Sequence, residues 1–356
     1  MKKLIFFIFA ISTLAFATCP KSCKNGCANY EIATASKSGT YYAFGKDIAS
    51  YIAPKACINL KVIETKGSID NIRKLKSKNY PRVKFAIVQS DVLQFYKKLL
   101  NSKIPRDRKE AKEILNKIRV IAPLYNEELH FLVNADSKLK TFSDLKNKRI
   151  VIGEPNSGTA MTAFILYKEL FGEDLKYPII QDFFSGLDSL GTKKADAILI
   201  VAGQPVKKLE TKNKEASKLF RLLEYSEKDG NNINSYYLST IKASSYSWLK
   251  EDIQTLSVKS YLITYNYSKK YTQTNLYNFI KAFKDNFDYL KKIASNDKNT
   301  PHPKWKEVKN ICNFEHLPGG WKYYSILKSV CSNSTIDNNN AIPCTPQRRV
   351  YDSKCQ

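Results

Sequence analysis

Two segments of the sequence carry the residues Ser-Gly-Thr shortly after a predicted strand and directly before a helical pattern. The first copy is Ser38-Gly39-Thr40 and the second is Ser157-Gly158-Thr159. The first N–H groups of a helix have no intrahelical partner, so together with the helix dipole they can bind an anion. Glycine lets a ligand approach the backbone, and the hydroxyl groups add donors. The pair predicts two anion-binding helix ends, although N-capping by Ser or Thr would explain either copy alone.

Polar residues follow two further apolar runs at the equivalent place in the pattern. Gln89-Ser90-Asp91 follows the run at 83–88, and Gly203-Gln204-Pro205 follows the run at 196–201. In open α/β sheets, ligands bind at such carboxyl ends of strands. Asp91 could instead cap the helix that follows it. If the two units form two lobes, the two Ser-Gly-Thr anion sites would face each other across a cleft and suit a ligand with charge at both ends.

The histidines do not form part of a recognisable catalytic set. His130, His302 and His316 lack a zinc-ligand spacing. Ser157 does not lie in a G-x-S-x-G elbow, and the sequence has no phosphate-binding loop ending in Gly-Lys-Ser/Thr. The sequence therefore favours a binding protein over an enzyme and predicts no cofactor. His130 could line the cleft, or it could be a structural histidine bonded near the lobe crossing.

Alternating strand and helix patterns predict an α/β fold with parallel sheets. The strands of a first unit are expected at 30–36, 60–65 and 83–89, with helices at 40–52 and 69–75. A second unit is expected to have strands at 149–153 and 196–201 around a helix at 159–171. Between the units, 119–125 and 129–135 read as two strands crossing from one lobe to the next. Later, 255–265 reads as a returning strand and 276–293 as an amphipathic helix.

The first residues predict export from the cytoplasm. Lys2 and Lys3 precede a short apolar run that closes in Ala15-Phe16-Ala17, which is the pattern of a secretory signal cleaved after Ala17. The run is shorter than the roughly 20 apolar residues of a membrane-spanning helix. Cys19 raises the alternative of a lipid anchor, but Thr18 before it does not fit a lipobox. We expect a periplasmic protein that is not anchored.

Eight cysteines lie outside the predicted signal and cluster at the two ends of the chain. An even count in an exported protein predicts disulfides, whose pairing the sequence leaves open. The spacing of Cys19, Cys23 and Cys27 also resembles a metal site, but no histidine lies nearby. Beyond Ser329 the composition shifts to Ser, Asn, Pro and Cys, which predicts a loop-rich, disulfide-held tail.

The formal net charge of +25 raises the question of a nucleic-acid partner. The positive charge comes mostly from lysines that are scattered along the chain and interleaved with Asp and Glu. No stripe of arginine with interleaved aromatic residues is present, and arginine is the residue that forks onto phosphate. We therefore expect no nucleic-acid partner. A field of this sign can raise the local concentration of anionic ligands.

Several runs, in order, resemble the TAXI receptors of TRAP transporters over about 30–325. They are Thr34-Ala35-Ser36 through Ser38-Gly39-Thr40-Tyr41-Tyr42, Ser68 to Ile72, Phe85 to Val92, Leu124-Tyr125 with Glu127 and His130, Ser157-Gly158-Thr159, Asp196 to Pro205, and His316 to Gly319 with Tyr323-Tyr324. The resemblance implies a two-lobed periplasmic-binding-protein fold of the two-crossover class and a small carboxylate ligand, either a glutamate-like amino acid or a 2-oxo or dicarboxylate. It implies TRAP membrane subunits as partners. It also implies ligand-binding residues, namely Ser38, Gly39, Thr40, Tyr41, Gln89, Ser90, Ser157, Gly158, Thr159, Gly203 and Gln204.

We expect the chain to divide into a signal at 1–17, a discontinuous first lobe at 30–124 and 250–325, a second lobe at 125–249 and a Cys-rich tail at 326–356. We expect a monomer. The sequence departs from the family at 77–84, in the Cys-rich head and in the tail, which leaves the exact ligand open. An alternative is a sensory or scaffold protein that uses the same clamp to signal to a membrane kinase or another envelope protein. A third alternative is that the protein is an enzyme.

Overall fold

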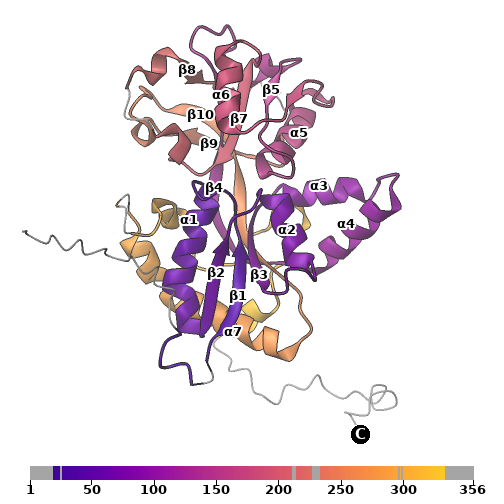
Figure 1. Cartoon of the computed structure of the whole chain (residues 1–356), viewed down its shortest axis with the longest axis vertical. Helices are drawn as coiled ribbons and strands as arrows, with labels where there is room; N and C mark the ends of the chain where they lie inside the picture. The colour runs from indigo at the N-terminus through magenta and orange to yellow at the C-terminus, as the bar shows by residue number, and fades with distance from the viewer. Residues whose placement is uncertain are drawn as a thin grey trace, which may run out of the picture.

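In the computed structural model, the chain forms two lobes joined by two long strands (Figure 1). The structure describes residues 19–332, except residue 25 and the segments 211–213, 227–232, 296 and 298–299. The predicted signal at 1–17, Cys344 and Cys355 therefore lie outside the described residues. Within the described part, no helix has both the length and the apolar character needed to cross a membrane.

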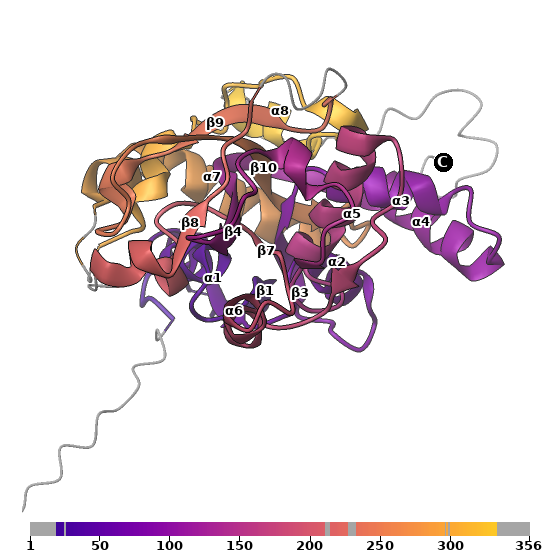
Figure 2. The same ribbon diagram turned by 90° about the horizontal axis from the view of Figure 1, so that it is seen from above.

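The first lobe contains a parallel sheet with the strand order β2-β1-β3. Its strands are β1 (Ala28–Ala33), β2 (Ile58–Ile63) and β3 (Val83–Gln89). Nearly every residue of β3 is buried, as expected for a strand that is covered on both faces. The helices of this lobe are α1 (Thr40–Asp47), α2 (Ser68–Lys76), α3 (Val92–Leu99), α4 (Pro105–Lys117), α7 (Lys270–Ile293) and α8 (Ile326–Cys331). Helices α3 and α4 extend to one side of the lobe (Figures 1 and 2).

The second lobe also contains strand–helix–strand units. Strands β5 (Ile150–Val151), β6 (Pro178–Ile179) and β7 (Ala197–Ala202) are parallel, with β5 in the middle. Helices α5 (Gly158–Phe171) and α6 (Phe183–Gly191) connect them. Gly172 ends α5 in the left-handed conformation at φ 69°, which glycine adopts without a steric penalty. Two short strands complete the lobe, β8 (Phe220–Leu222) and β9 (Tyr237–Ile241).

Strands β4 (Ile118–Asn134) and β10 (Ile253–Tyr265) run through both lobes. They pair antiparallel from the Ile118–Tyr265 pair to the Glu128–Ser257 pair. Further along, β4 pairs with β7 and β10 pairs with β9. The returning strand expected at 255–265 is confirmed. The two strands expected at 119–125 and 129–135 are one strand, because the polar residues between them remain in the ladder.

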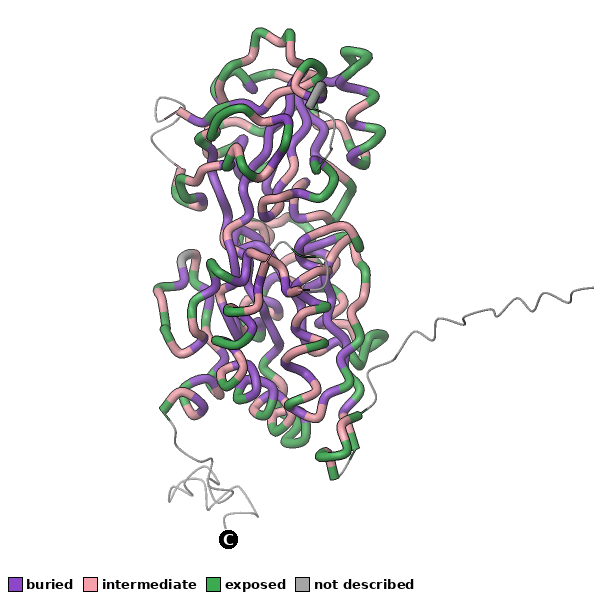
Figure 3. Tube along the Cα trace, turned by 90° about the vertical axis from the view of Figure 1, so that its left-hand side faces the viewer, coloured by how far each residue is buried: buried purple, intermediate pink, exposed green. Residues whose placement is uncertain are grey.

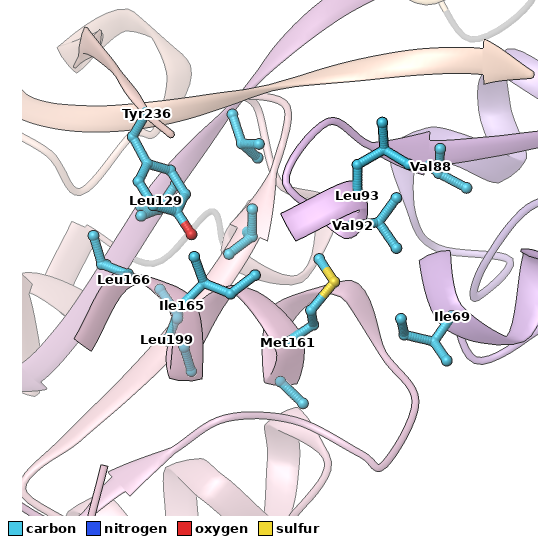
Figure 4. Packing of buried hydrophobic residues seen from close by; sticks show 14 of the residues in the cluster. Ile69, Val88, Val92, Leu93, Leu129, Met161, Ile165, Leu166, Leu199 and Tyr236 are labelled. Carbon is cyan, nitrogen blue, oxygen red and sulfur yellow. The ribbon is translucent and has the colours of Figure 1, made fainter. Parts of the chain in front are cut away.

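Three apolar clusters stabilise this arrangement. One lies in the first lobe, where Trp305 stacks on Phe44 with ring centroids 4.3 Å apart. Another lies in the second lobe. The third is continuous across the junction, where Met161 on α5 points toward Ile69 and Val92 of the first lobe (Figure 4). Most residues of the two crossing strands are buried between the lobes, with a few of intermediate exposure among them (Figure 3).

Disulfides staple both ends of the described chain to the first lobe. The bonds are Cys19–Cys27, Cys23–Cys57 and Cys312–Cys331. Cys19, Cys23 and Cys27 therefore take part in two disulfides and do not form the metal site that their spacing had suggested. The start of the expected tail is also not a loop: residues 326–331 form α8, and Leu327 and Val330 are buried in the core of the first lobe.

Replacing Cys312 and Cys331 with alanine should lower the free energy of unfolding by about 3 kcal/mol. The disulfide closes a loop over 19 residues in the unfolded chain, and its removal raises the conformational entropy of that chain. Urea unfolding of both proteins without reductant would measure the difference. Equal unfolding free energies would show that this disulfide does not stabilise the docking of α8.

Candidate functional site

The two Ser-Gly-Thr loops both lie at the junction of the lobes, but they make different contacts. Gly39 caps α1 without a side-chain hydrogen bond, and Thr40 Oγ1 donates to the carbonyl of Gly203 in the second lobe at 3.4 Å. Ser157 caps α5 by accepting a hydrogen bond from the N–H of Ala160 at 3.0 Å. N-capping therefore accounts for Ser157, but no side chain caps α1.

The start of α5 is pressed against the first lobe. A Cβ placed on Gly158 would overlap Gln89 Oε1 and lie 3.0 Å from Ser68 Oγ. Gln89 Nε2 also donates to Thr162 Oγ1 at 3.3 Å. Gly67 has φ +113°, and a Cβ there would lie 3.2 Å from the backbone nitrogen of Gly158. Glycine at both positions permits this backbone approach, so the structure represents a closed arrangement of the lobes.

Asp91 links the lobes through a buried carboxylate. Its Oδ2 accepts hydrogen bonds from Thr162 Oγ1 at 2.7 Å and from the Tyr236 hydroxyl at 3.0 Å, both in the second lobe. Asp91 lies at the start of α3, yet its side chain makes no capping hydrogen bond there, so the capping alternative is wrong. Burial raises the pKa of Asp91 to about 6, and the two hydroxyl donors oppose this shift.

Adjacent glutamates on β4 have different surroundings. Glu128 Oε1 pairs with Lys304 Nζ at 2.7 Å, and its Oε2 accepts from the N–H of Gln204 at 2.9 Å. Lys304 lies in η8 (Pro303–Glu307) and also pairs with Glu307 at 2.7 Å. Glu127, in contrast, accepts a hydrogen bond from the Tyr41 hydroxyl at 2.9 Å and has no ion pair among the described residues. Burial raises the pKa of Glu127 well above its ordinary value.

His130 has a structural role at the crossing. One ring nitrogen, Nδ1, lies 2.9 Å from the carbonyl of Glu128, and Nε2 lies 3.0 Å from the Tyr246 hydroxyl. The ring is fully buried, and burial lowers its pKa to about 4, so it is neutral near pH 7. Of the two readings of His130, the structure supports the histidine bonded near the lobe crossing.

A groove of about 980 Å³ opens between the lobes beside α1. The first lobe contributes the start of α1 and the segment around η8, and the second lobe contributes residues after β7 and β9. Three lysines on its walls, Lys46, Lys207 and Lys306, form no ion pair among the described residues. The volume lies within the range of small-molecule sites. The groove is lined by six lysines and four acidic residues, so it offers a polar approach to the start of α1 with a small excess of positive charge.

A family model described as the NMT1-like family matches residues 32–325. The chain belongs to the NMT1-like family. Its architecture is the two-lobed periplasmic-binding-protein fold expected from the sequence, because two α/β lobes are joined by two crossing strands. The narrower resemblance to TAXI receptors stays a prediction for this NMT1-like protein.

Solved structures with similar folds come from several organisms. The arginine-, lysine-, histidine-binding protein ArtJ from Geobacillus stearothermophilus has 14% identity and a TM-score of 0.44, covering 74% of this chain and 92% of that one. A Candida albicans gene product described as having the generic periplasmic binding protein fold has 14% identity and a TM-score of 0.45, covering 79% and 81%. An arginine transport system periplasmic binding protein from Legionella pneumophila has 13% identity and a TM-score of 0.42, covering 74% and 96%.

The structure brings eight of the eleven predicted site residues of this NMT1-like protein to the junction in two groups. Those that line the groove are Ser38, Gly39, Thr40 and Gln204. Those that contact the opposite lobe or the crossing strands are Tyr41, Gln89, Gly158 and Gly203. Ser90 is placed by its backbone, whose carbonyl accepts from Trp321 Nε1 at 2.8 Å, and Thr159 Oγ1 accepts from the N–H of Val201 at 3.4 Å.

Sequence reasoning missed the residues that meet Asp91 and Glu128. Thr162 lies inside the helix expected at 159–171, and Tyr236 lies in a segment for which the sequence predicted no element. Lys304 lies 176 residues from its partner Glu128, and a lysine in a lysine-rich chain carries no local signal. The run Glu127-Glu128 beside His130 was a visible signal, because two adjacent acids in an otherwise apolar strand are costly to bury.

Replacing Gly158 with valine should prevent the lobes from closing to this extent, because the side chain would overlap Gln89. Small-angle scattering would then give a larger radius of gyration for the variant than for the wild-type protein in the same buffer. The matched control is Gly191→Val at the end of α6, where a Cβ would meet no atom within 4 Å. An unchanged radius in the Gly158 variant would contradict the close approach.

Asp91→Asn should flatten the pH dependence of stability. The folded protein holds a proton on Asp91 up to about pH 6, whereas the unfolded chain releases it near 3.8. The stabilisation is therefore full below pH 3.8 and is lost as the pH rises through about 6, an effect of about 3 kcal/mol for this group. Urea unfolding at pH 4.5 and pH 7.5 checks this. An equal loss of stability in wild type and variant would contradict it.

Proposed function

We propose that this protein is the extracytoplasmic solute receptor of a TRAP-type secondary transporter and that it captures a small carboxylate between its lobes. The observation that carries the proposal is the set of buried polar contacts that exists only when the lobes meet. Asp91 with Thr162 and Tyr236, and Thr40 with the carbonyl of Gly203, all join groups from opposite lobes. Such contacts give the closed form a defined geometry that a solute can favour over the open form.

The positive end of α1 supports an anionic solute. Its first turn has no side-chain cap and opens on the groove with its small excess of positive charge, so the first N–H groups of the helix can bind a carboxylate. The residues that we assign to ligand binding are those expected from the sequence, with the groove as the side from which the solute reaches them. Membrane subunits of the transporter would receive the solute from the closed form.

The disulfides support a location outside the cytoplasm, where such bonds persist. Cys19 Sγ is bonded to Cys27, so it is not free to carry a lipid. Both features agree with an exported receptor released by cleavage after Ala17. The sensory or scaffold alternative rests on the cysteine-rich ends, which solute capture does not need and whose described part forms three disulfides.

A thermal-shift screen of residues 18–356 against amino acids, 2-oxo acids and dicarboxylates tests the proposal. A solute that binds the native state alone adds about 2.7 kcal/mol at a hundredfold excess over its dissociation constant, so one carboxylate should raise the melting temperature clearly. Related neutral amides at the same concentration serve as controls. A folded protein that responds to none of the carboxylates would contradict capture.

A further inference from the structure

The carboxyl group of Asp91 is buried by contacts that exist only while the lobes meet. The residue lies at the start of α3 in the first lobe and is 2% exposed. Both hydrogen bonds that its Oδ2 accepts come from the second lobe, from Thr162 on α5 and from Tyr236 just before β9. The neighbouring Val92 faces Met161 of α5 in the same contact (Figure 4). Opening the lobes would therefore remove both donors and admit water to this side chain.

No cation compensates a negative charge on Asp91. Among the described residues it forms no ion pair, and its Oδ1 is buried without a hydrogen-bond partner. Taking an ionised carboxylate out of water is costly unless an opposite charge lies beside it. A proton on Oδ1 removes the charge and leaves both hydrogen bonds to Oδ2 in place. The closed arrangement thus suits the neutral acid.

The acidic groups nearest to Asp91 also oppose its ionisation. Glu169 of α5 acts on Asp91 from the second lobe, and its charge raises the pKa of Asp91. Glu127 of β4 and Asp91 likewise repel each other, since the charge of Asp91 raises the pKa of Glu127. The hydrogen-bond partner of Glu127, Tyr41, belongs to the first lobe, so this pair does not depend on closure.

The other elements around α3 do not place a cation on Asp91. The lysines of α3 itself, Lys97 and Lys98, lie in its last turn. Helix α4 packs against α3 and buries only Ala111 and Ile114, so its charged side chains lie outside the core. Segment η9 (Pro318–Gly320) has no titratable side chain. On β10, the side chain of Lys259 interacts with the acids at 307 and 315.

The proton affinity of Asp91 therefore depends on whether the lobes are closed. Burial raises its pKa to about 6 in the closed form, against an ordinary value of 3.8. Without that burial, the pKa returns toward the ordinary value. A group whose pKa is higher in one of two forms stabilises that form fully below the lower pKa, and the stabilisation is lost as the pH rises through the higher one.

We propose that closure of the lobes takes up a proton at Asp91, so that a low pH favours the closed form and a rise in pH favours opening. The proton comes from the solvent on closing and returns to it on opening, and only the O–H bond of the carboxyl group forms or breaks. The coupling does not depend on which solute is captured. The ratio of closed to open molecules should fall about tenfold between pH 5 and pH 7.5.

Carbon-13 NMR of protein labelled at the aspartate side-chain carboxyl tests the coupling, because it reports the titration midpoint of Asp91 directly. The Asp91 signal is the one that is missing in Asp91→Asn. We expect a midpoint of about 6 in the wild-type protein and one near 3.8 in Gly158→Val, whose valine side chain holds the lobes apart. Two pH units correspond to about a hundredfold difference in proton affinity.

Asp47 is the matched control in the same spectra. Burial also raises its pKa to about 6, but its partners are the N–H of His302 at 2.9 Å and Trp305 Nε1 at 2.8 Å, both in the first lobe. Its midpoint should therefore stay the same in Gly158→Val. Gly191→Val, where a Cβ meets no atom within 4 Å, should leave both midpoints at their wild-type values.

Each outcome decides the inference separately from solute capture, which the thermal-shift screen tests. A wild-type midpoint near 3.8 would overturn the coupling, and so would a midpoint that is unchanged in a Gly158→Val protein of larger radius. An equal shift of Asp47 would overturn it as well, because it would indicate general loosening of the protein. A Gly158→Val protein with the wild-type radius would remove the closed contact on which the coupling rests.

Discussion

The antiparallel pair of β4 and β10 is the constraint on which the two-lobed arrangement depends. The ladder runs from the Ile118–Tyr265 pair to the Glu128–Ser257 pair with two register shifts, and each strand then joins the sheet of the second lobe. The lobes cannot slide apart without breaking backbone hydrogen bonds whose loss inside the protein is costly. Relative motion is therefore confined to bending of this pair.

The alternation of side chains along β4 explains why two adjacent glutamates have different roles. Successive residues of a strand point to opposite faces, so Glu127 and Glu128 cannot share one environment. Glu128 meets Lys304 of η8 and the backbone of Gln204, and thereby ties the first lobe to the loop after β7. Glu127 meets the Tyr41 hydroxyl at the start of α1. One acid therefore ties the two lobes together, and the other contacts the first turn of α1.

Apolar and polar contacts contribute differently to the closed form. The cluster around Met161, Ile69 and Val92 favours contact between the lobes but tolerates small shifts, because hydrophobic burial is not directional. The hydrogen bonds of Asp91 and the close approach of Gly67 to Gly158 require a particular register. The polar contacts therefore define the closed geometry, while the apolar cluster supplies much of the attraction. A solute between the lobes adds its own contacts to both.

The sequence by itself determined the α/β class, the two Ser-Gly-Thr helix starts and the returning strand at 255–265. These follow from local periodicity and from glycine at turns, which depend on neighbours in the chain. The tertiary structure decided which residues meet. It merged the two expected crossing strands into β4, paired the cysteines, gave Asp91 partners on the other lobe instead of a capping role, and brought Lys304 to Glu128. No local pattern encodes these pairings, because each depends on how the β4–β10 pair positions segments that are far apart in the chain.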